Sequence, residues 1–128
     1  TSYSVDGIRV TCLSREASFR TTTAVSHPNP NRFHIVIGHS PNYALGRVEA
    51  DLLLAGHTHG GQVRLPLIGP LSTHTEAPRD WAAGRTELPS GATLIVSRGV
   101  GMERAEAPPI RFLCRPQLVV LELLPTEN

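Results

Sequence analysis

Two nearly continuous apolar runs dominate the hydrophobic pattern of this chain, and each one ends in glycine. The runs are FHIVIG, residues 33–38, and DLLLAG, residues 51–56. Strands covered on both faces lack the alternation of apolar and polar residues seen in half-exposed strands, so we interpret both runs as buried strands. PNYALGRVEA, residues 41–50, lies between them, and its Pro41 suits the first turn of a short helix. The order strand, helix, strand predicts two parallel strands of one sheet.

The remaining elements are predicted from shorter signals. β-Branched residues in GIRVTCL, residues 7–13, and TLIVSRG, residues 93–99, indicate strands, as does the apolar run QLVVLELL, residues 117–124. Residues 14–32 are polar and become rich in Pro and Asn, which indicates a loop with at most a short helix. No long amphipathic pattern follows Gly61, so we expect antiparallel strands in that half. The pattern as a whole predicts an α/β fold.

Composition narrows the class of protein. The chain has 128 residues and is 40% hydrophobic, which suits one globular domain with a real core. Its formal net charge of +1 gives no electrostatic reason to expect nucleic acid as a partner. No run approaches the ~20 apolar residues that span a bilayer. The two cysteines, Cys12 and Cys114, form no Cys-x-x-Cys pair, and we interpret them as buried thiols.

Three of the six histidines directly follow predicted strands. His39 comes after the first apolar run, His57 after the second, and His59 two residues later. The carboxyl ends of neighbouring parallel strands meet at one rim of a sheet, where open α/β sheets bind ligands. Imidazole suits Zn, Fe, Mn and similar ions, so this rim is a candidate metal site. In a turn, His57 and His59 diverge enough to reach two different ions, and Gly60 and Gly61 allow a close approach of the backbone.

The other three histidines have simpler explanations. His34 lies inside a predicted strand and is interpreted as a packed side chain. His27 precedes Pro28 and is interpreted as a solvated loop residue. His74, in the polar stretch STHTE, is interpreted as a loop residue, with contact to the rim of the site as the alternative.

The carboxylates that a hydrolytic metal centre needs are not at suitable places. A catalytic zinc takes three protein ligands and a water, and a two-metal centre usually adds a bridging carboxylate. Asp51 begins a predicted strand and therefore lies at the wrong end, while Asp6 and Asp80 lie in turn-like contexts. The sequence predicts three imidazoles at the rim and no carboxylate beside them.

Two motifs resemble the last two metal motifs of calcineurin-like metallophosphoesterases. They are IVIGHSPN, residues 35–42, and DLLLAGHTHGGQVRLPLIGP, residues 51–70. The stretches SRGVG and PIRFLCRPQLVVLEL narrow the resemblance to a bacterial branch of predicted phosphohydrolases, which includes phosphodiesterases and a nucleotide-sugar lipid pyrophosphatase. The resemblance extends from about residue 8 to residue 124 and includes several motifs in the family's order.

The resemblance implies the C-terminal part of a four-layer α/β/β/α sandwich with a dinuclear metal centre at the sheet ends. Residues 1–128 would be the C-terminal portion of a single calcineurin-like phosphoesterase domain. Carried over residue by residue, His39 and His57 would ligate the second metal and His59 the first. The two divalent ions, Mn, Zn, Fe or Mg, would convert a bridging water into hydroxide.

Several motifs of the family are missing from this chain. Its D-x-H, G-D-x-x-D and G-N-H motifs supply the bridging Asp, an Asn ligand and the His that assists the leaving group, and none of them occurs here. The resemblance therefore implies no catalytic residue in this chain, and a chain that is inactive alone. A non-catalytic metal-binding or interaction module derived from such an enzyme is the alternative. A cupin-like barrel also uses His-x-His, but its usual downstream Glu is absent.

The resemblance also implies partners. The expected substrate is a phosphorylated small molecule or a lipid-linked one, and the arginines that could meet its phosphate are Arg64, Arg98, Arg104 and Arg111. Half of a sandwich exposes a sheet face and an open edge, so we expect the chain to need its N-terminal half or to self-associate. Relatives are often membrane-associated or exported, and a cytoplasmic or peripheral membrane location in a bacterium is the expectation.

Overall fold

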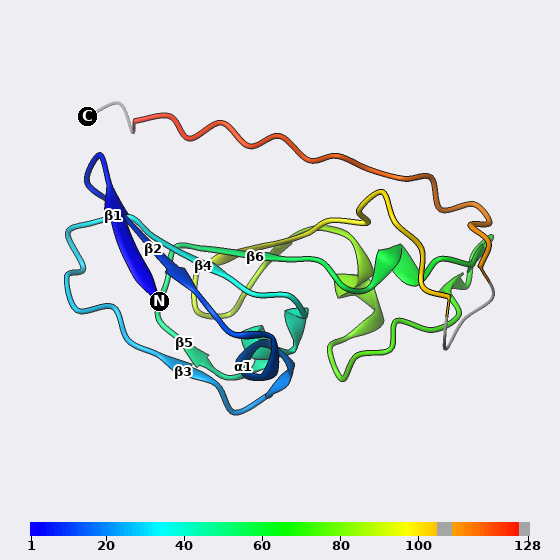
Figure 1. Cartoon of the computed structure of the whole chain (residues 1–128), viewed down its shortest axis with the longest axis horizontal. Helices are drawn as coiled ribbons and strands as arrows, with labels where there is room; N and C mark the ends of the chain where they lie inside the picture. Colours follow the sequence, from blue (N-terminus) through cyan, green and yellow to red (C-terminus); the bar gives the residue numbers. More distant parts are fainter. Residues whose placement is uncertain (105–108, 126–128) are drawn as a thin grey trace.

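The computed structural model, which describes residues 1–104 and 109–125, is built around one six-stranded mixed sheet (Figure 1). Its strand order is β1-β2-β4-β6-β10-β9. The bounds of these strands are Ser2–Val5 (β1), Ile8–Cys12 (β2), His34–Ile37 (β4), Leu52–Ala55 (β6), Gly84–Glu87 (β9) and Thr93–Val96 (β10). The four inner strands are parallel, and β1 and β9 pair antiparallel with their neighbours.

Short elements connect and cover the sheet. They are the helix α1 (Arg15–Phe19), the parallel pair β3 (Ala24–Val25) and β5 (Arg47–Val48), the antiparallel pair β7 (Arg64–Leu65) and β8 (Gly69–Pro70), and the 3₁₀ turns η1 (Pro41–Leu45), η2 (His59–Gly61) and η3 (Arg79–Ala82). Figure 1 shows α1 and the β3–β5 pair on one side of the main sheet. Residues 109–125, here called the C-terminal arm, run along the other side. Among the described residues, no helix has the length and apolar character needed to cross a membrane.

The core lies between the main sheet and the layer formed by α1 and η1. Val36, Leu53 and Leu94 occupy matching positions on β4, β6 and β10 and are each at most 1% exposed. Tyr43 of η1 packs on them and is fully buried. Its hydroxyl donates to the carbonyl oxygens of Val36 and Leu54, at 3.0 Å each, so the one polar atom of this side chain is satisfied. Burial raises the pKa of the Tyr43 hydroxyl well above its ordinary value.

The predicted strands of the first half are confirmed. The two apolar runs form β4 and β6, which are parallel as expected, and the segment between them forms η1 followed by β5. In the polar segment, residues 14–32, the short helix is α1, and the two-residue strand β3 follows it. The expectation of antiparallel strands after Gly61 is only partly right, because β10 joins β6 in parallel and extends the main sheet.

The strand predicted over residues 117–124 is wrong. Gln117 donates its amide to the carbonyl of Gly99, but no backbone hydrogen bond joins residues 118–125 to another described residue. Leu118 and Val120 are 83% and 84% exposed. The segment has the composition of a strand, but a strand exists only where a neighbouring backbone pairs with it.

Two histidines contact each other, with their rings tilted by 57°, at the opposite end of the sheet from the predicted metal site. His34 is fully buried, as predicted, with Nδ1 2.9 Å from the carbonyl of Glu49 and Nε2 2.8 Å from the Thr11 hydroxyl. The interpretation of His27 as solvated is wrong, because its side chain is 12% exposed and its ring centroid lies 4.9 Å from that of His34. Asp51 lies 3.7 Å from its Nε2 and holds the ring there.

The His34 environment predicts a loss of stability in acid. Burial is the main cause that lowers the pKa of His34, whereas in the unfolded chain the pKa is about 6.5. The unfolded state therefore binds a proton first, so the stabilisation is complete above pH ~6.5 and is lost as the pH falls toward the lowered folded value. Urea unfolding at pH 7.5 and 5.5 should show this loss, and His34→Gln should reduce it. An equal pH dependence in both proteins would contradict the assignment.

Candidate metal centre

The ends of β4 and β6 bring two of the predicted histidines together. Gly38 donates to the carbonyl of Leu54, and Gly56 donates to the carbonyl of His39, so the two strands stay paired up to the histidines. His39 Nε2 lies 3.1 Å from His57 Nδ1, and the two ring centroids are 4.9 Å apart. The sequence-based expectation that neighbouring strand ends meet at one rim is correct for this pair.

Hydrogen bonds assign the protons on the two rings. His57 Nε2 lies 3.3 Å from the carbonyl oxygen of His74, which can only accept, so Nε2 carries the proton. His57 Nδ1 then offers its lone pair to His39 Nε2. Burial, followed by the neighbouring ring of His57 and the charge of Arg15, lowers the pKa of His39. Burial also lowers the pKa of His57, so both rings are neutral near pH 7, which is the form that ligates metals.

The spacing of these nitrogens would fit a metal ion in the tautomer in which His39 carries its proton on Nδ1, so that Nε2 offers a lone pair. Two nitrogens that each lie about 2.1 Å from one ion, at ligand angles between octahedral and tetrahedral, are about 3.0–3.4 Å apart, and the observed spacing of 3.1 Å falls in this range. The bond from His57 to the His74 carbonyl is the kind of supporting contact that orients metal-ligating imidazoles. Within the part of the chain that the structure describes, no group of three or more His, Cys, Asp and Glu side chains could hold an ion.

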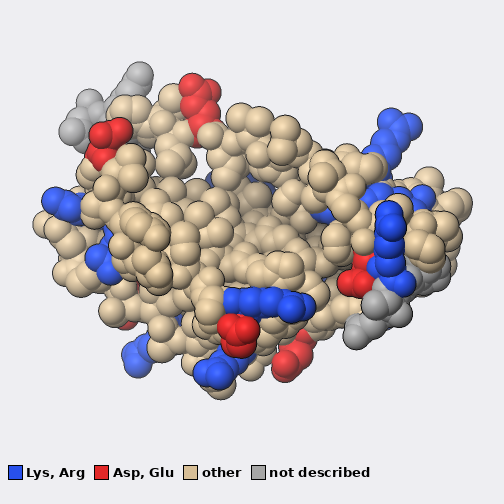
Figure 2. All heavy atoms as spheres, viewed as in Figure 1, with Lys and Arg blue, Asp and Glu red and all other residues tan. Residues whose placement is uncertain are grey.

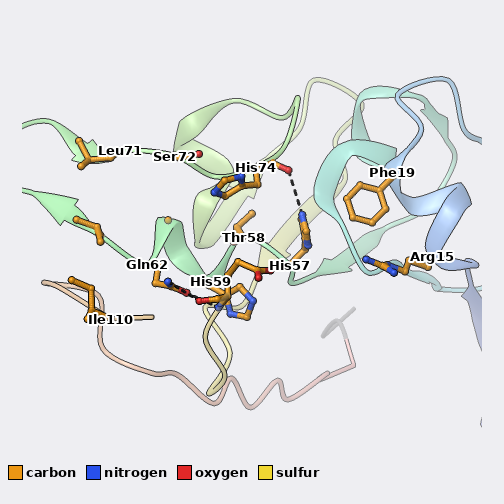
Figure 3. Close-up of a pocket in the computed structure, with 13 residues that line it drawn as sticks. Arg15, Phe19, His57, Thr58, His59, Gln62, Leu71, Ser72, His74 and Ile110 are labelled. Atoms are coloured by element: carbon orange, nitrogen blue, oxygen red, sulfur yellow. Dashed lines mark hydrogen bonds between the residues drawn. The ribbon is translucent and has the colours of Figure 1, made fainter. Parts of the chain in front are cut away.

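His59 does not join this pair. Figure 3 shows the rings of His57 and His59 pointing in different directions, as expected for His-x-His in a turn. The turn is unusual because His57, His59 and Gln62 have φ values of 68°, 48° and 53°, a region that side chains rarely adopt. Gly60 and Gly61 between them are also left-handed. Such strained backbone persists where its surroundings fix it, and it is concentrated at functional sites.

Arg111 is the main residue that fixes this turn from outside. Its guanidinium donates to the carbonyls of His59, Arg98, Gly99, Gly101 and Cys114. The buried thiol of Cys114 also donates to the His59 carbonyl, at 3.3 Å. The amide side chain of Gln62 makes two bonds to the main chain of Glu103, 3.1 and 2.6 Å long. Residues 57–62, here called the histidine turn, are thus joined to two segments that are more than 35 residues away in sequence.

A cavity of about 700 Å³ opens beside the histidines (Figure 3). His57, His59, Gln62 and Glu103 contribute polar groups, and its apolar wall includes Phe19, Leu71 and Ile110. His74 lines the same cavity, so the alternative of a rim contact is the correct one for this histidine. A volume in this range suits a small-molecule ligand.

Comparison with known proteins places the chain in a family. It is 39% identical over 97 residues to an uncharacterized metallophosphoesterase, YkuE, of Bacillus subtilis, a match that covers 73% of this chain and 32% of the relative. It is 37% identical over 92 residues to the phosphodiesterase YaeI of Escherichia coli, a match that covers 70% of this chain and 32% of the relative. An uncharacterized metallophosphoesterase of Aquifex aeolicus is 33% identical over 93 residues, 72% of this chain and 33% of the relative.

This chain belongs with the metallophosphoesterases. It spans about a third of the length of the curated relatives that it matches. No family model and no solved structure matches the chain. The names of these relatives imply the use of a divalent metal.

Two residues beside the histidine pair were not predicted from the sequence. The ring of Phe19 lies 4.7 Å from that of His57 and 5.7 Å from that of His39, and the guanidinium carbon of Arg15 lies 5.7 Å from the Phe19 centroid. Both residues belong to α1, which directly follows β2. Because β2 is parallel to β4, its carboxyl end reaches the same rim, and this signal could have identified the segment.

The arginines proposed from sequence to meet phosphate have other contacts. Arg111 is occupied by carbonyl oxygens, and Arg64 donates to the carbonyl of Gly60 at 3.2 Å. The Nε atom of Arg98 is buried behind Gly60 and lacks a hydrogen-bond partner among the described residues. Arg104 is exposed. None of these four lines the cavity.

Proposed function

We propose that this metallophosphoesterase chain contributes one part of a dinuclear metal centre that hydrolyses phosphodiester or pyrophosphate bonds. The facing nitrogens of His39 and His57 at the rim of a parallel sheet carry this proposal. His39 and His57 would hold the second ion of the centre, and His59, which lines the cavity beside them, would hold the first. The bridging carboxylate and the remaining ligands would come from an N-terminal part, so the chain alone would be inactive.

The residues of the chain would orient the metal ligands and the substrate for the reaction. Bound divalent ions, whether Mn, Zn, Fe or Mg, supply an activated water and offset the charge on the phosphoryl oxygens. His57 is held for ligation by the carbonyl of His74, and the strained turn sets the direction of the His59 ring. The apolar wall at Leu71 and Ile110 would take the uncharged part of a phosphorylated small-molecule or lipid-linked substrate.

We also propose that the chain is the C-terminal portion of a single calcineurin-like, four-layer α/β/β/α domain. The sheet face opposite the core supports this, because register places Cys12, Ile37, Leu54 and Ile95 in one row across it. Ile37 is 38% exposed on that face. The missing part of the sandwich, or a second copy of the chain, would cover it. Figure 2 shows charged side chains scattered around the view, with a largely uncharged centre.

A non-catalytic metal-binding or interaction module is the second candidate. Only two imidazole nitrogens face each other within the described ranges, and no third ligand accompanies them. Such a chain would bind one ion weakly and hydrolyse nothing. Calorimetry with Zn²⁺ and Mn²⁺ measures the number of ions that the chain binds.

Replacing His57 tests the proposed function. In the whole protein, His57→Ala should lower Mn²⁺-dependent hydrolysis of bis(p-nitrophenyl) phosphate by at least about 100-fold, because it removes a ligand and the tautomer of its partner is no longer defined. His27→Gln, which changes a histidine at the other end of the sheet, is the matched control and should retain activity. Equal activity of wild type and His57→Ala would exclude this centre, and a wild-type protein without hydrolysis would favour the second candidate.

A further inference from the structure

We propose that Arg15 binds the phosphoryl oxygens of the substrate at the rim beside His39 and His57. This inference rests on the proposed function and names a substrate-binding residue in the same site. Arg15 is a cation that lines the cavity next to the histidine pair, and its guanidinium has no hydrogen bond to another residue that the structure describes.

Phe19 places this cation. Arg15 and Phe19 lie four residues apart on α1, so their side chains meet on one face of the helix, and the guanidinium carbon lies 5.7 Å from the ring centroid. The same ring meets His57 edge-on, at 4.7 Å and 80°, and lies 5.7 Å from the His39 ring. One aromatic ring therefore contacts the cation and both histidines. Figure 3 shows the guanidinium of Arg15 directed toward His57.

The N–H donors of the Arg15 guanidinium are not used by another residue that the structure describes. The guanidinium has no hydrogen bond and no ion pair with any other residue that the structure describes, and the residue is exposed. This distinguishes it from Arg111, whose donors are used by main-chain carbonyls, and from Arg64, which is bound to Gly60. Among these arginines, Arg15 both lines the cavity and keeps its donors for a ligand.

The chemistry of the neighbours favours a phosphoryl group as the ligand. A guanidinium presents a planar set of donors that matches two oxygens of a phosphate. The donors lie beside two imidazoles whose nitrogens face each other, so with a divalent ion bound there the rim would present two kinds of positive charge to one anion. The apolar ring of Phe19 shields one face of the guanidinium, which strengthens its contact with an anion on the other side.

Binding of inorganic phosphate tests the proposal without requiring hydrolysis. Phosphate is titrated into the chain by calorimetry, at low ionic strength and with a chelator present to remove metal. Arg15→Gln should weaken binding at least about fivefold, and Arg15→Lys should retain part of it, because lysine keeps the charge but not the planar donors. Phe19→Leu keeps the charge and should also weaken binding, because the guanidinium is no longer held at the rim.

Arg20→Gln is the matched control, since Arg20 is an exposed arginine directly after the same helix and its cap bond uses the main chain. An unchanged affinity in Arg15→Gln would overturn the proposal, and so would an equal loss in Arg20→Gln or a wild-type chain that binds no phosphate. Circular dichroism confirms that each variant is folded.

Activity of the whole protein separates this inference from the proposed function. Arg15→Gln should raise the KM for bis(p-nitrophenyl) phosphate more than it lowers kcat, because binding of the anion is lost first. Hydrolysis with a KM that Arg15→Gln leaves unchanged would overturn the role of Arg15 while the metal centre stands. If the protein binds phosphate through Arg15 but does not hydrolyse the phosphodiester, the proposed function is wrong and the anion-binding role of Arg15 is retained.

Discussion

Arg111→Gln is expected to lower the free energy of unfolding by about 3 kcal/mol, because hydrogen bonds to charged groups each contribute about 1.5–3 kcal/mol and several carbonyls lose their donor together. The guanidinium binds carbonyl oxygens of His59, Arg98, Gly99, Gly101 and Cys114. A glutamine amide is shorter and has two donors, so it cannot replace this set. Urea unfolding monitored by circular dichroism measures the change.

Arg115→Gln is the matched control for this experiment. Arg115 is an exposed arginine four positions later on the same arm, so its loss should change stability by no more than about 0.5 kcal/mol. Equal stability of Arg111→Gln and Arg115→Gln would show that the carbonyl contacts contribute little. A selective loss would mean that the histidine turn depends on a segment more than 50 residues away in the sequence.

Gly61→Ala is expected to destabilise the chain by at least about 3 kcal/mol, through overpacking added to the cost of a left-handed backbone. Gly61 has φ +80°, and a Cβ there would overlap the ring of Pro70 and lie 3.0 Å from the Ser72 carbonyl oxygen. A proline ring cannot rotate away, so the β7–β8 hairpin would have to separate from the histidine turn. Thermal unfolding measures the total effect.

Gly69→Ala isolates the backbone part of that effect. Gly69 has φ +83°, almost the same as Gly61, but a Cβ there would meet no atom within 4 Å. The free energy of unfolding of this variant should therefore fall only by the cost of the left-handed conformation, about 1–2 kcal/mol. A similar loss in both variants would show that the contact with Pro70 is not tight.

The meeting of His39 and His57 was predictable because it depends on local rules. Two apolar runs joined by a short crossover must pair in parallel, and the residues after them then share a rim. His59 was predicted to diverge from His57 for a similar reason, since the glycines after it permit a turn. These inferences need no knowledge of the third strand or of the loops.

The role of α1 was not predictable at the same level. Arg15 and Phe19 lie at the site only because β2 is the other neighbour of β4, and strand order is set by packing across the whole sheet. The arginines show the same limit, because the sequence does not reveal whether a guanidinium will meet main-chain carbonyls, as Arg111 does, or a cavity. The strand predicted at residues 117–124 failed because propensity is local and pairing is not.

We expect the C-terminal arm to give this chain a second equilibrium, one that depends on protein concentration rather than on denaturant. Beyond its attachments at Arg111, Cys114 and Gln117, the arm displays Leu118, Val120 and Leu124 beside main-chain groups that have no described partner. We expect two such arms to pair between molecules, in a bimolecular step whose extent rises with protein concentration while the parallel sheet stays intact. Unfolding would then report the cohesion of the core, whereas association would report how many copies of the chain are present.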